Sequence, residues 1–349
     1  MATTFITGGS GFIGRNLIRA LRSRGDDVRA LARTDAAIAR VTALGATPVR
    51  GTLDDTPALR DGMRGCDVVI HAAAQVTEWG PRQQYHHDNV TGTANVVAAA
   101  REAGVSRLVH LSTEAALADG APMVRIDESR PLPRNPYARY CASKAAAEAL
   151  VLAANGASLE TIVVRPRMVW GADDTSMLPQ LIEAVREGRF MWIGGGRHLT
   201  STCHVANVVD GVLCAMDAGR GGEAYIITDG EPMVLRDFMT RMLATQGVDP
   251  GNKSVPFAVA RATAWVAETL WDRLSLRGKP PITRMVVSLF GQEVTLVDAK
   301  ARRELGYVGP MSIDAGLAEL EGMSICAVKS LGTAPPTAIA RRKRAAPQA

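Results

Sequence analysis

Short runs of β-branched and apolar residues alternate with longer stretches at helical spacing in the first half of the chain. We expect strands at residues 3–7, 28–31, 68–71, 108–112 and 161–165, with helices after the first two, up to residue 24 and over residues 36–44. Strands and helices that alternate in this way form right-handed βαβ units in a parallel sheet. The pattern predicts an α/β fold: a doubly wound (Rossmann) parallel sheet covered by helices on both faces.

The pattern changes after Pro166 into mixed segments rich in Gly and Pro, which predicts a smaller C-terminal substrate-binding lobe. We expect the dinucleotide-binding domain to occupy residues 1–166 and also to receive residues 204–228. The lobe then spans residues 167–330. Residues 331–349 combine Ala, Pro and basic residues without apolar periodicity, and are expected to form a disordered basic tail.

Composition narrows the class of protein. The net charge is +5, and four of the positive charges lie together at residues 341–344, so the rest of the chain is nearly neutral. Aromatic residues make up only 5% of the chain, and this composition does not favour nucleic-acid binding. The five cysteines form no CxxC pair, which favours free thiols and no metal site. We expect a cytoplasmic protein with no export signal and no spanning segment, because no stretch of 18 apolar residues lacks charges.

Glycines 8, 11 and 14 stand directly between the first strand and an amphipathic helix. At this place Gly8 allows a tight turn, Gly11 lets a pyrophosphate approach the backbone, and Gly14 lets the helix pack closely on the sheet. The loop residues Ser10, Phe12 and Ile13 belong to the same expected cofactor site. The spacing predicts that the chain binds the pyrophosphate of a dinucleotide.

The end of the second strand indicates which dinucleotide. Ala32 stands where NAD-binding chains usually carry an acidic residue, and Arg33 follows it. An arginine suits a ribose 2′-phosphate, so the sequence favours NADP over NAD. Two alternatives stay open: Arg33 is a solvated surface residue, and Asp35 belongs either to a helix N-terminus or to a ribose contact.

Tyr140 and Lys144 are the candidate catalytic pair. Their spacing of four puts both side chains on one face of a helix expected over residues 140–154. A lysine cation beside a phenol stabilises the phenolate, so that the tyrosine can exchange a proton with an alcohol or carbonyl oxygen. Tyr137 is excluded as the catalytic tyrosine because Cys141 stands four residues after it.

Hydroxyl groups at the end of the strand over residues 108–112 lie where parallel sheets place ligands. We expect Thr113, rather than Ser112, to polarise the substrate oxygen. Ser112 is also consistent with an ordinary hydroxyl bonded to backbone. Glu114 is either a helper at the substrate or a helix-capping carboxylate.

With these residues in place, residues 2 to about 325 resemble the extended short-chain dehydrogenase/reductases. The resemblance implies that Leu53, Asp54, Ala72, Ala73, Ala74, Asn89 and Pro166 contact the cofactor and that Lys144 also holds the nicotinamide ribose. It rests on the ordered motifs TGxxGxxG at residues 7–14, an acidic residue at 54, the Ala-Ala element at 71–74, NxxGT at 89–93, YxxxK at 140–144, RPxxVxG at 165–171 and HVxNVV at 204–209.

Within that family the chain looks most like the branch of 3β-hydroxysteroid dehydrogenases and 2-alkyl-3-oxoalkanoate reductases. This implies hydride transfer between the nicotinamide and a secondary alcohol or ketone of a hydrophobic substrate, and a homodimer formed through residues 89–103 and 140–154. A nucleotide-sugar epimerase that keeps NAD bound is the enzymatic alternative. A non-catalytic NAD(P)-sensing regulator is the other, although such a protein usually loses the Tyr/Lys pair.

Apolar and polar residues after three expected strands are candidates for the substrate wall. They are Gln75, Val76, Trp79, Glu114, Met168, Trp170, Met191, Trp192, His198 and Thr200. Met191 and Trp192 are equally consistent with the core of the lobe, and His204 is expected to be structural. A helix over residues 258–274 carries a stripe at Val259, Trp265, Val266, Leu270 and Trp271. We expect this stripe to pack in the core or as a lid over the pocket, with peripheral membrane contact as the alternative.

Overall fold

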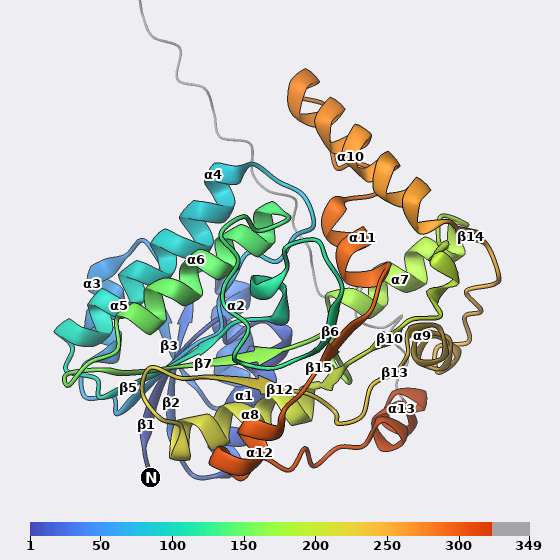
Figure 1. Cartoon of the computed structure of the whole chain (residues 1–349). Helices are drawn as coiled ribbons and strands as arrows, with labels where there is room; N and C mark the ends of the chain where they lie inside the picture. The colour runs from blue at the N-terminus through green and yellow to red at the C-terminus, as the bar shows by residue number, and fades with distance from the viewer. Residues whose placement is uncertain (323–349) are drawn as a thin grey trace, which may run out of the picture.

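A seven-stranded parallel sheet forms the centre of the molecule (Figure 1). The computed structural model describes residues 1–322. The strand order is β12-β7-β5-β4-β1-β2-β3, and the chain therefore crosses over between β3 and β4, as in a doubly wound sheet. The predicted fold class is confirmed. Its strands are β1 (Thr3–Thr7), β2 (Asp27–Ala32), β3 (Thr47–Arg50), β4 (Val68–His71), β5 (Arg107–Leu111), β7 (Glu160–Pro166) and β12 (Ala224–Ile227).

Helices cover both faces of this sheet because neighbouring strand residues point to opposite sides. Ile6 belongs to a buried cluster that includes residues of α1, α2, α8 and α12, whereas Phe5 belongs to one that includes residues of α3, α5 and α6. The helical segments associated with the sheet are α1 (Phe12–Ser23), α2 (Asp35–Ala43), α3 (Thr56–Met63), α4 (Arg82–Tyr85), the π-helix η1 (His86–Thr91), α5 (Gly92–Glu102), η2 (Glu114–Leu117), α6 (Arg139–Ala153), α8 (Val205–Ala218) and α12 (Ala299–Leu305).

The C-terminal lobe is built around a four-stranded sheet of order β13-β10-β15-β6. Its strand β6 comes from the first half of the chain, so the lobe does not begin only after Pro166. The segment 204–228 supplies α8 and β12 to the main sheet. The elements of the lobe are β6 (Met123–Ile126), β8 (Val169–Trp170), α7 (Met177–Arg186), β9 (Trp192–Ile193), η3 (Gly194–Gly196), β10 (Leu199–Thr200), β11 (Cys203–His204), β13 (Met233–Val234), α9 (Leu235–Ala244), β14 (Ser254–Val255), α10 (Phe257–Leu274), α11 (Arg284–Phe290), β15 (Val294–Leu296) and α13 (Ile313–Glu321).

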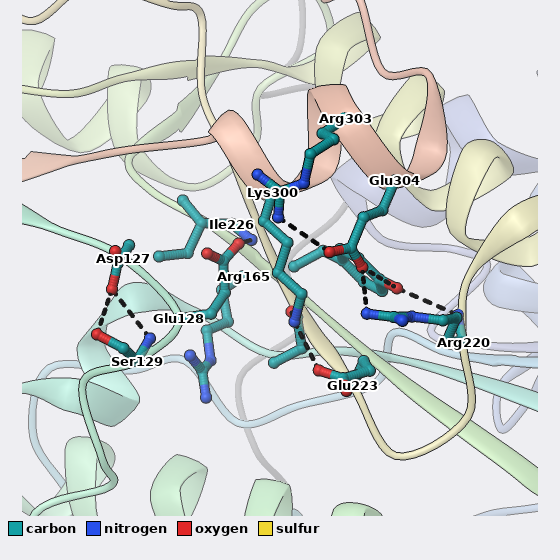
Figure 2. Close-up of polar contacts among 12 residues, drawn as sticks. Asp127, Glu128, Ser129, Arg165, Arg220, Glu223, Ile226, Lys300, Arg303 and Glu304 are labelled. Atoms are coloured by element: carbon teal, nitrogen blue, oxygen red, sulfur yellow. Dashed lines mark hydrogen bonds and ion pairs between the residues drawn. The ribbon is translucent and has the colours of Figure 1, made fainter.

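Polar contacts cover the outer edge of β12, the last strand of the main sheet (Figure 2). The Ile226 amide donates to Glu128 Oε1 at 2.7 Å, and the Lys300 ammonium donates to Glu223 Oε2 at 2.6 Å and to the carbonyl of Ala224 at 2.9 Å. Burial raises the pKa of Glu128. These contacts occupy backbone groups that would otherwise be open to pairing with another strand.

The expected tail at residues 331–349 lies outside the described residues, and so does Cys326. The other four cysteines have free thiols. Among the helices of residues 1–322, none is both long and apolar enough to cross a bilayer. Within the same range, no group of three or more His, Cys, Asp or Glu side chains is placed to hold a metal ion.

Candidate active site

The glycine loop after β1 fits the pyrophosphate of a dinucleotide. Gly8 has φ +73°, and a Cβ there would lie 2.7 Å from the Ala73 amide nitrogen. A Cβ at Gly14 would lie 2.1 Å from the Gly8 carbonyl oxygen, so both positions require glycine. Gly11 is the N-cap of α1, where no side chain bonds the helix N-terminus and the first turn has no acidic residue. The amide groups of this terminus are therefore available to an anion.

The residues that we expected around the pyrophosphate lie together on this loop. Ser10 precedes the cap, and its carbonyl accepts a hydrogen bond from Arg15 at 3.2 Å. Phe12 and Ile13 form the first turn of α1. Arg15 also donates to the carbonyl of Asp173, at 2.8 Å, which connects the loop to the lobe.

Arg33 is exposed directly after β2, at the carboxyl end of this strand, where the ribose that carries the 2′-hydroxyl of NAD or the 2′-phosphate of NADP is expected. Thr34 caps α2 by accepting from the Ala37 amide at 3.2 Å. Asp35 lies in the first turn of α2 and forms an ion pair with Arg50, at the end of the neighbouring strand β3. The structure therefore places Asp35 at a helix N-terminus, which was one of its two alternatives.

Leu53 and Asp54 lie on the loop after β3, close to the π-helix η1. The Leu53 carbonyl accepts from Asn95 Nδ2 at 2.9 Å. Asp54 is exposed, and its carboxylate lies 3.2 Å from His87 Nε2. A hydrogen bond to Asp88 and the charge of Asp54 raise the pKa of His87. Asp54 is therefore open to solvent, as an adenine contact requires.

Asn89 holds the loop after β4 against the catalytic helix. Its Nδ2 donates to the Ser143 hydroxyl at 2.9 Å and to the Gln75 carbonyl at 3.1 Å, while its Oδ1 accepts from the Gln75 amide at 2.7 Å. Asn89 is buried within η1, and π-turns of this kind are frequent at functional sites. Asn89 thus fixes the loop of Ala72, Ala73 and Ala74 at its end through Gln75, and its expected contact with the cofactor stays a prediction.

Tyr140 and Lys144 lie one turn apart near the start of α6, as the spacing predicted. Lys144 is 2% exposed, and its ammonium donates to the Leu111 carbonyl at 2.9 Å. Burial lowers the pKa of Lys144 to about 8, and Glu148 opposes this shift. Burial and then the charge of Glu114 raise the pKa of Tyr140, while the Thr113 hydroxyl lowers it. In the protein without cofactor, the phenol is therefore protonated at neutral pH.

Two buried histidines complete the surroundings of Lys144. His110 Nε2 lies 3.5 Å from the Lys144 ammonium, and the His71 ring lies 5.1 Å from the His110 ring. Burial, and then the charge of Lys144, lowers the pKa of His71 to about 3 and that of His110 well below its usual value. Both rings are therefore neutral. Sequence reasoning missed them, although a histidine within each apolar strand was a visible signal.

A buried carboxylate lies beside Thr113. The Thr113 hydroxyl donates to Glu114 Oε2 at 2.6 Å, and Arg167 Nη1 donates to Glu114 Oε1 at 2.7 Å. Arg167 is itself held by the Thr200 hydroxyl and the Leu289 carbonyl. Glu114 thus has both oxygens bonded within the protein, and the N-cap of η2 is Thr113 instead, so that the role of Glu114 as a helper at the substrate stays a prediction.

A second buried carboxylate lies beside Ser112. The Ser112 hydroxyl donates to Glu148 Oε2 at 2.6 Å, and Arg165 pairs with both oxygens of Glu148. The Ser112 hydroxyl therefore donates to a buried carboxylate, and not to a backbone group, which was the alternative for this residue. The sequence analysis did not identify Glu148 or Arg167 as site residues.

Residues 5–258 match the 3-beta hydroxysteroid dehydrogenase/isomerase family. The chain belongs to this family. It is 54% identical, over 90% of its length and 94% of the relative's, to the 4-hydroxy-2-methyl-3-oxo-4-farnesyl-3,4-dihydroquinoline-1-oxide ketoreductase of Stigmatella aurantiaca. It is 37% identical to the 2-alkyl-3-oxoalkanoate reductase of Stenotrophomonas maltophilia, over 91% of this chain and 98% of that one.

Solved structures show the same fold. The crystal structure of gox2253 superposes with a TM-score of 0.73 at 28% identity, covering 92% of this chain and 98% of that one. A dTDP-glucose 4,6-dehydratase from Streptomyces venezuelae, solved with NAD bound, has a TM-score of 0.72 at 24% identity and covers 91% and 95% of the two chains. At this identity the likeness concerns the fold alone.

In this family member, the two tryptophans of the expected substrate region lie in the core of the lobe. Trp170 has no exposed surface; its indole N–H donates to Asp229 at 2.8 Å, and its ring packs edge-on to Phe238. Trp192 is also buried, and its indole donates to the Gly251 carbonyl at 2.9 Å. The expectation that Trp170 forms part of a substrate wall is therefore corrected, because this side chain fills the core between β8 and α9.

The remaining candidates differ in exposure. Trp79 is half-buried under the guanidinium of Arg139, which lies 4.3 Å from the ring centre, whereas Thr200 is buried and bonded to Arg167. His204 caps α8 by accepting from the Ala206 amide, which is the structural role expected. The other candidates for the substrate wall are Gln75, Met168 and His198, which are half-buried, and Val76 and Met191, which are exposed.

Proposed function

We propose that this chain catalyses hydride transfer between a nicotinamide dinucleotide and a secondary alcohol or ketone of a hydrophobic substrate. The observation that carries the proposal is the meeting of Tyr140, Lys144 and Thr113 at the end of β5. The matched relatives named as a farnesyl-dihydroquinoline ketoreductase and a 2-alkyl-3-oxoalkanoate reductase support a hydrophobic keto substrate. The substrate is therefore expected to be steroid-like or a β-keto acyl compound.

The chain's own residues provide the proton and the orientation. The bound dinucleotide would supply or accept the hydride at the carbonyl carbon. In ketone reduction the Tyr140 phenol donates its proton to the carbonyl oxygen, and the Lys144 cation stabilises the phenolate that remains. Lys144 would also hold the nicotinamide ribose, and Pro166, at the end of β7, would border the ring. Alcohol oxidation is the reverse of these steps.

Thr113 is the candidate donor to the substrate oxygen. A threonine hydroxyl carries one proton, which here is donated to Glu114. Thr113 therefore polarises the substrate oxygen only after its bond to Glu114 opens. Its partner carboxylate consequently controls how much Thr113 contributes.

For the cofactor we propose a preference for NADP. Arg33 is exposed at the end of β2, and the nearest carboxylate, Asp35, is paired with Arg50. A ribose 2′-phosphate would therefore meet a cation without a competing anion. Arg33→Asp should weaken NADPH binding by about tenfold or more and leave NADH binding within about twofold, measured by quenching of protein fluorescence. An unchanged ratio of the two affinities would remove Arg33 from the cofactor site.

A cytoplasmic homodimer formed through α5 and α6 is part of the same proposal. Light scattering after gel filtration measures its mass directly. A monomer at the concentrations used for the activity assay would contradict the dimer without affecting the chemistry proposed.

Absorbance of the reduced nicotinamide tests the reaction. NADPH or NADH is supplied with ketosteroids, β-keto acids and UDP-sugars, to the wild type and to Tyr140→Phe, with cofactor binding measured for both. We expect turnover of an apolar ketone that falls about a thousandfold in the variant, while cofactor binding is kept. Conversion of a UDP-sugar without net cofactor consumption would instead establish an epimerase. Binding of cofactor with no turnover of any compound would favour a sensing protein.

A further inference from the structure

Helix α10 presents its large apolar residues to solvent. It projects from the lobe at the top of the molecule (Figure 1). Its buried positions are the small residues Ala260, Ala264 and Ala267, together with Glu268, whose carboxylate is bonded to Arg284. Four of the five stripe residues face outward instead: Trp265 is 60% exposed, and Val259, Val266 and Leu270 are also exposed, whereas Trp271 is half-buried. That expectation from the sequence is wrong because the alanine face makes the contact with the lobe.

The apolar surface continues past the end of the helix. Leu274 and Leu276 are exposed as well, so that six of the twelve large hydrophobic residues exposed in residues 1–322 lie between residues 257 and 276. Scattered apolar residues are ordinary on a protein surface, but a concentrated patch of this kind marks an interaction surface. A hollow of about 610 Å³ between this helix and Tyr137 is part of it.

The charges around the patch are mostly positive. Arg261 lies near the start of the stripe, and Arg273 and Arg277 lie at its end, whereas Lys279 beyond them pairs with Glu78. The acidic residues of this segment are already engaged, since Glu268 is buried against Arg284 and Asp272 pairs with Arg139. An apolar stripe with cations at both ends complements a surface that is apolar inside and anionic outside.

We propose that α10 and the turn after it dock the protein on an anionic lipid bilayer. Trp265, Val266 and Leu270 enter the boundary between headgroups and acyl chains, where a tryptophan is well accommodated. Arg261, Arg273 and Arg277 contact lipid phosphates.

A second copy of the chain fits this surface less well than a bilayer does. Cations stand at both ends of the stripe. Two α10 helices packed face to face, in either relative direction, would therefore bring arginines from the two copies together. A bilayer of anionic lipids instead pairs each of these cations with a phosphate.

Co-sedimentation of the full-length protein with vesicles tests the proposal, and does not depend on any activity. The vesicles are phosphatidylcholine alone, or with about 25% phosphatidylglycerol. We expect binding to the anionic vesicles that weakens at about 0.5 M NaCl. The triple variant Trp265→Ser/Val266→Ser/Leu270→Ser should bind at least about tenfold more weakly, with an unchanged circular dichroism spectrum.

The matched control is Val124→Ser/Val308→Ser, which removes two exposed apolar residues elsewhere and should bind as the wild type does. The basic residues 341–344 stay in every variant, so a difference reports on α10. Brominated lipids should also quench wild-type fluorescence more than that of Trp265→Phe. Absent binding to anionic vesicles, equal binding by the triple variant, or equal loss in the control would overturn the proposal. The proposal would also be overturned if the wild type did not bind vesicles but formed a dimer that the triple substitution, and not the control substitution, converted to a monomer.

Discussion

Two neighbouring residues at the end of β5 enter the same kind of network on two sides of the site. Ser112 donates to Glu148, which Arg165 pairs with, and Thr113 donates to Glu114, which Arg167 pairs with. In both networks the carboxylate is buried, and the arginine comes from the end of β7 or the residue after it. The local chemistry is the same, so a difference in function must come from what each carboxylate faces.

Glu148 changes the pKa of Lys144, and Glu114 changes the pKa of Tyr140. Glu148 lies four residues after Lys144 on α6, and its charge raises the pKa of that lysine against the effect of burial. The charge of Glu114 adds to burial in raising the pKa of Tyr140. The charge of Glu148 therefore favours the protonated form of Lys144, whereas the charge of Glu114 adds to burial in disfavouring the phenolate of Tyr140. Together they favour the state in which Tyr140 donates a proton to a ketone at neutral pH.

The largest effect is expected from removing one carboxylate outright. Glu148→Leu should lower the free energy of unfolding by about 3–5 kcal/mol, because Arg165 would be left as a buried charge without its partner. Urea unfolding followed by circular dichroism measures it. The matched variant is Glu114→Leu, which strands Arg167 in the same way and should lose a similar amount. A loss below about 1 kcal/mol in either variant would show that the arginine finds another partner.

A second prediction concerns the lysine that Glu148 supports. An unfolded lysine has a pKa of about 10.4, so keeping Lys144 protonated with a pKa of about 8 costs about 3 kcal/mol below pH 8. Lys144→Met should therefore raise the free energy of unfolding at pH 7 by an amount of this order, while it abolishes turnover. Between pH 8 and about 10.4 the unfolded wild type binds more protons than the folded one, so wild-type stability rises with pH.

The advantage of Lys144→Met should consequently shrink from pH 7 to pH 10, as urea titrations at the two values would measure. Lys144→Arg is the control, since it keeps a cation that does not lose its proton in this range. If Lys144→Met raised the free energy of unfolding by the same amount at pH 7 and pH 10, the protonated form of Lys144 would not be destabilising in the folded protein.

The parts of the site that could be predicted are those set by local spacing. Gly8, Gly11 and Gly14 stand within one turn between a strand and a helix, and Tyr140 and Lys144 stand one helical turn apart. Five of the seven strands of the parallel sheet were likewise visible in the alternation of strands and helices, whereas no range was predicted for β3 or β12.

The two carboxylate networks could not be predicted, because their partners meet only through the strand order. Glu114 and Arg167 are 53 residues apart in the chain and meet because β5 and β7 are neighbours in the sheet. Helical periodicity gave the stripe on α10, but not which face meets the lobe. Trp170 fills the core because Asp229, 59 residues later, accepts its indole proton.

The smallest predicted effect is the one that separates the two networks most sharply. Glu114→Gln removes a negative charge near Tyr140, which stabilises the phenolate and lowers the pKa of the phenol. Ketone reduction needs the protonated phenol, so the alkaline limb of its pH profile should move to lower pH, by about one unit. The measurement is kcat/KM for ketone reduction across the alkaline range in wild type and variant.

Glu148→Gln should act in the opposite direction. Loss of its charge lowers the pKa of Lys144, and a neutral lysine no longer stabilises the phenolate, so Tyr140 holds its proton to higher pH.

Because Glu114→Gln leaves Arg167 buried without its carboxylate, the double variant Glu114→Gln/Arg167→Met provides the same test in a site without that cation. If both carboxylate variants shift the limb the same way, the division between a lysine network and a tyrosine network fails. If neither shifts it, the two pairs are structural supports that happen to border the site.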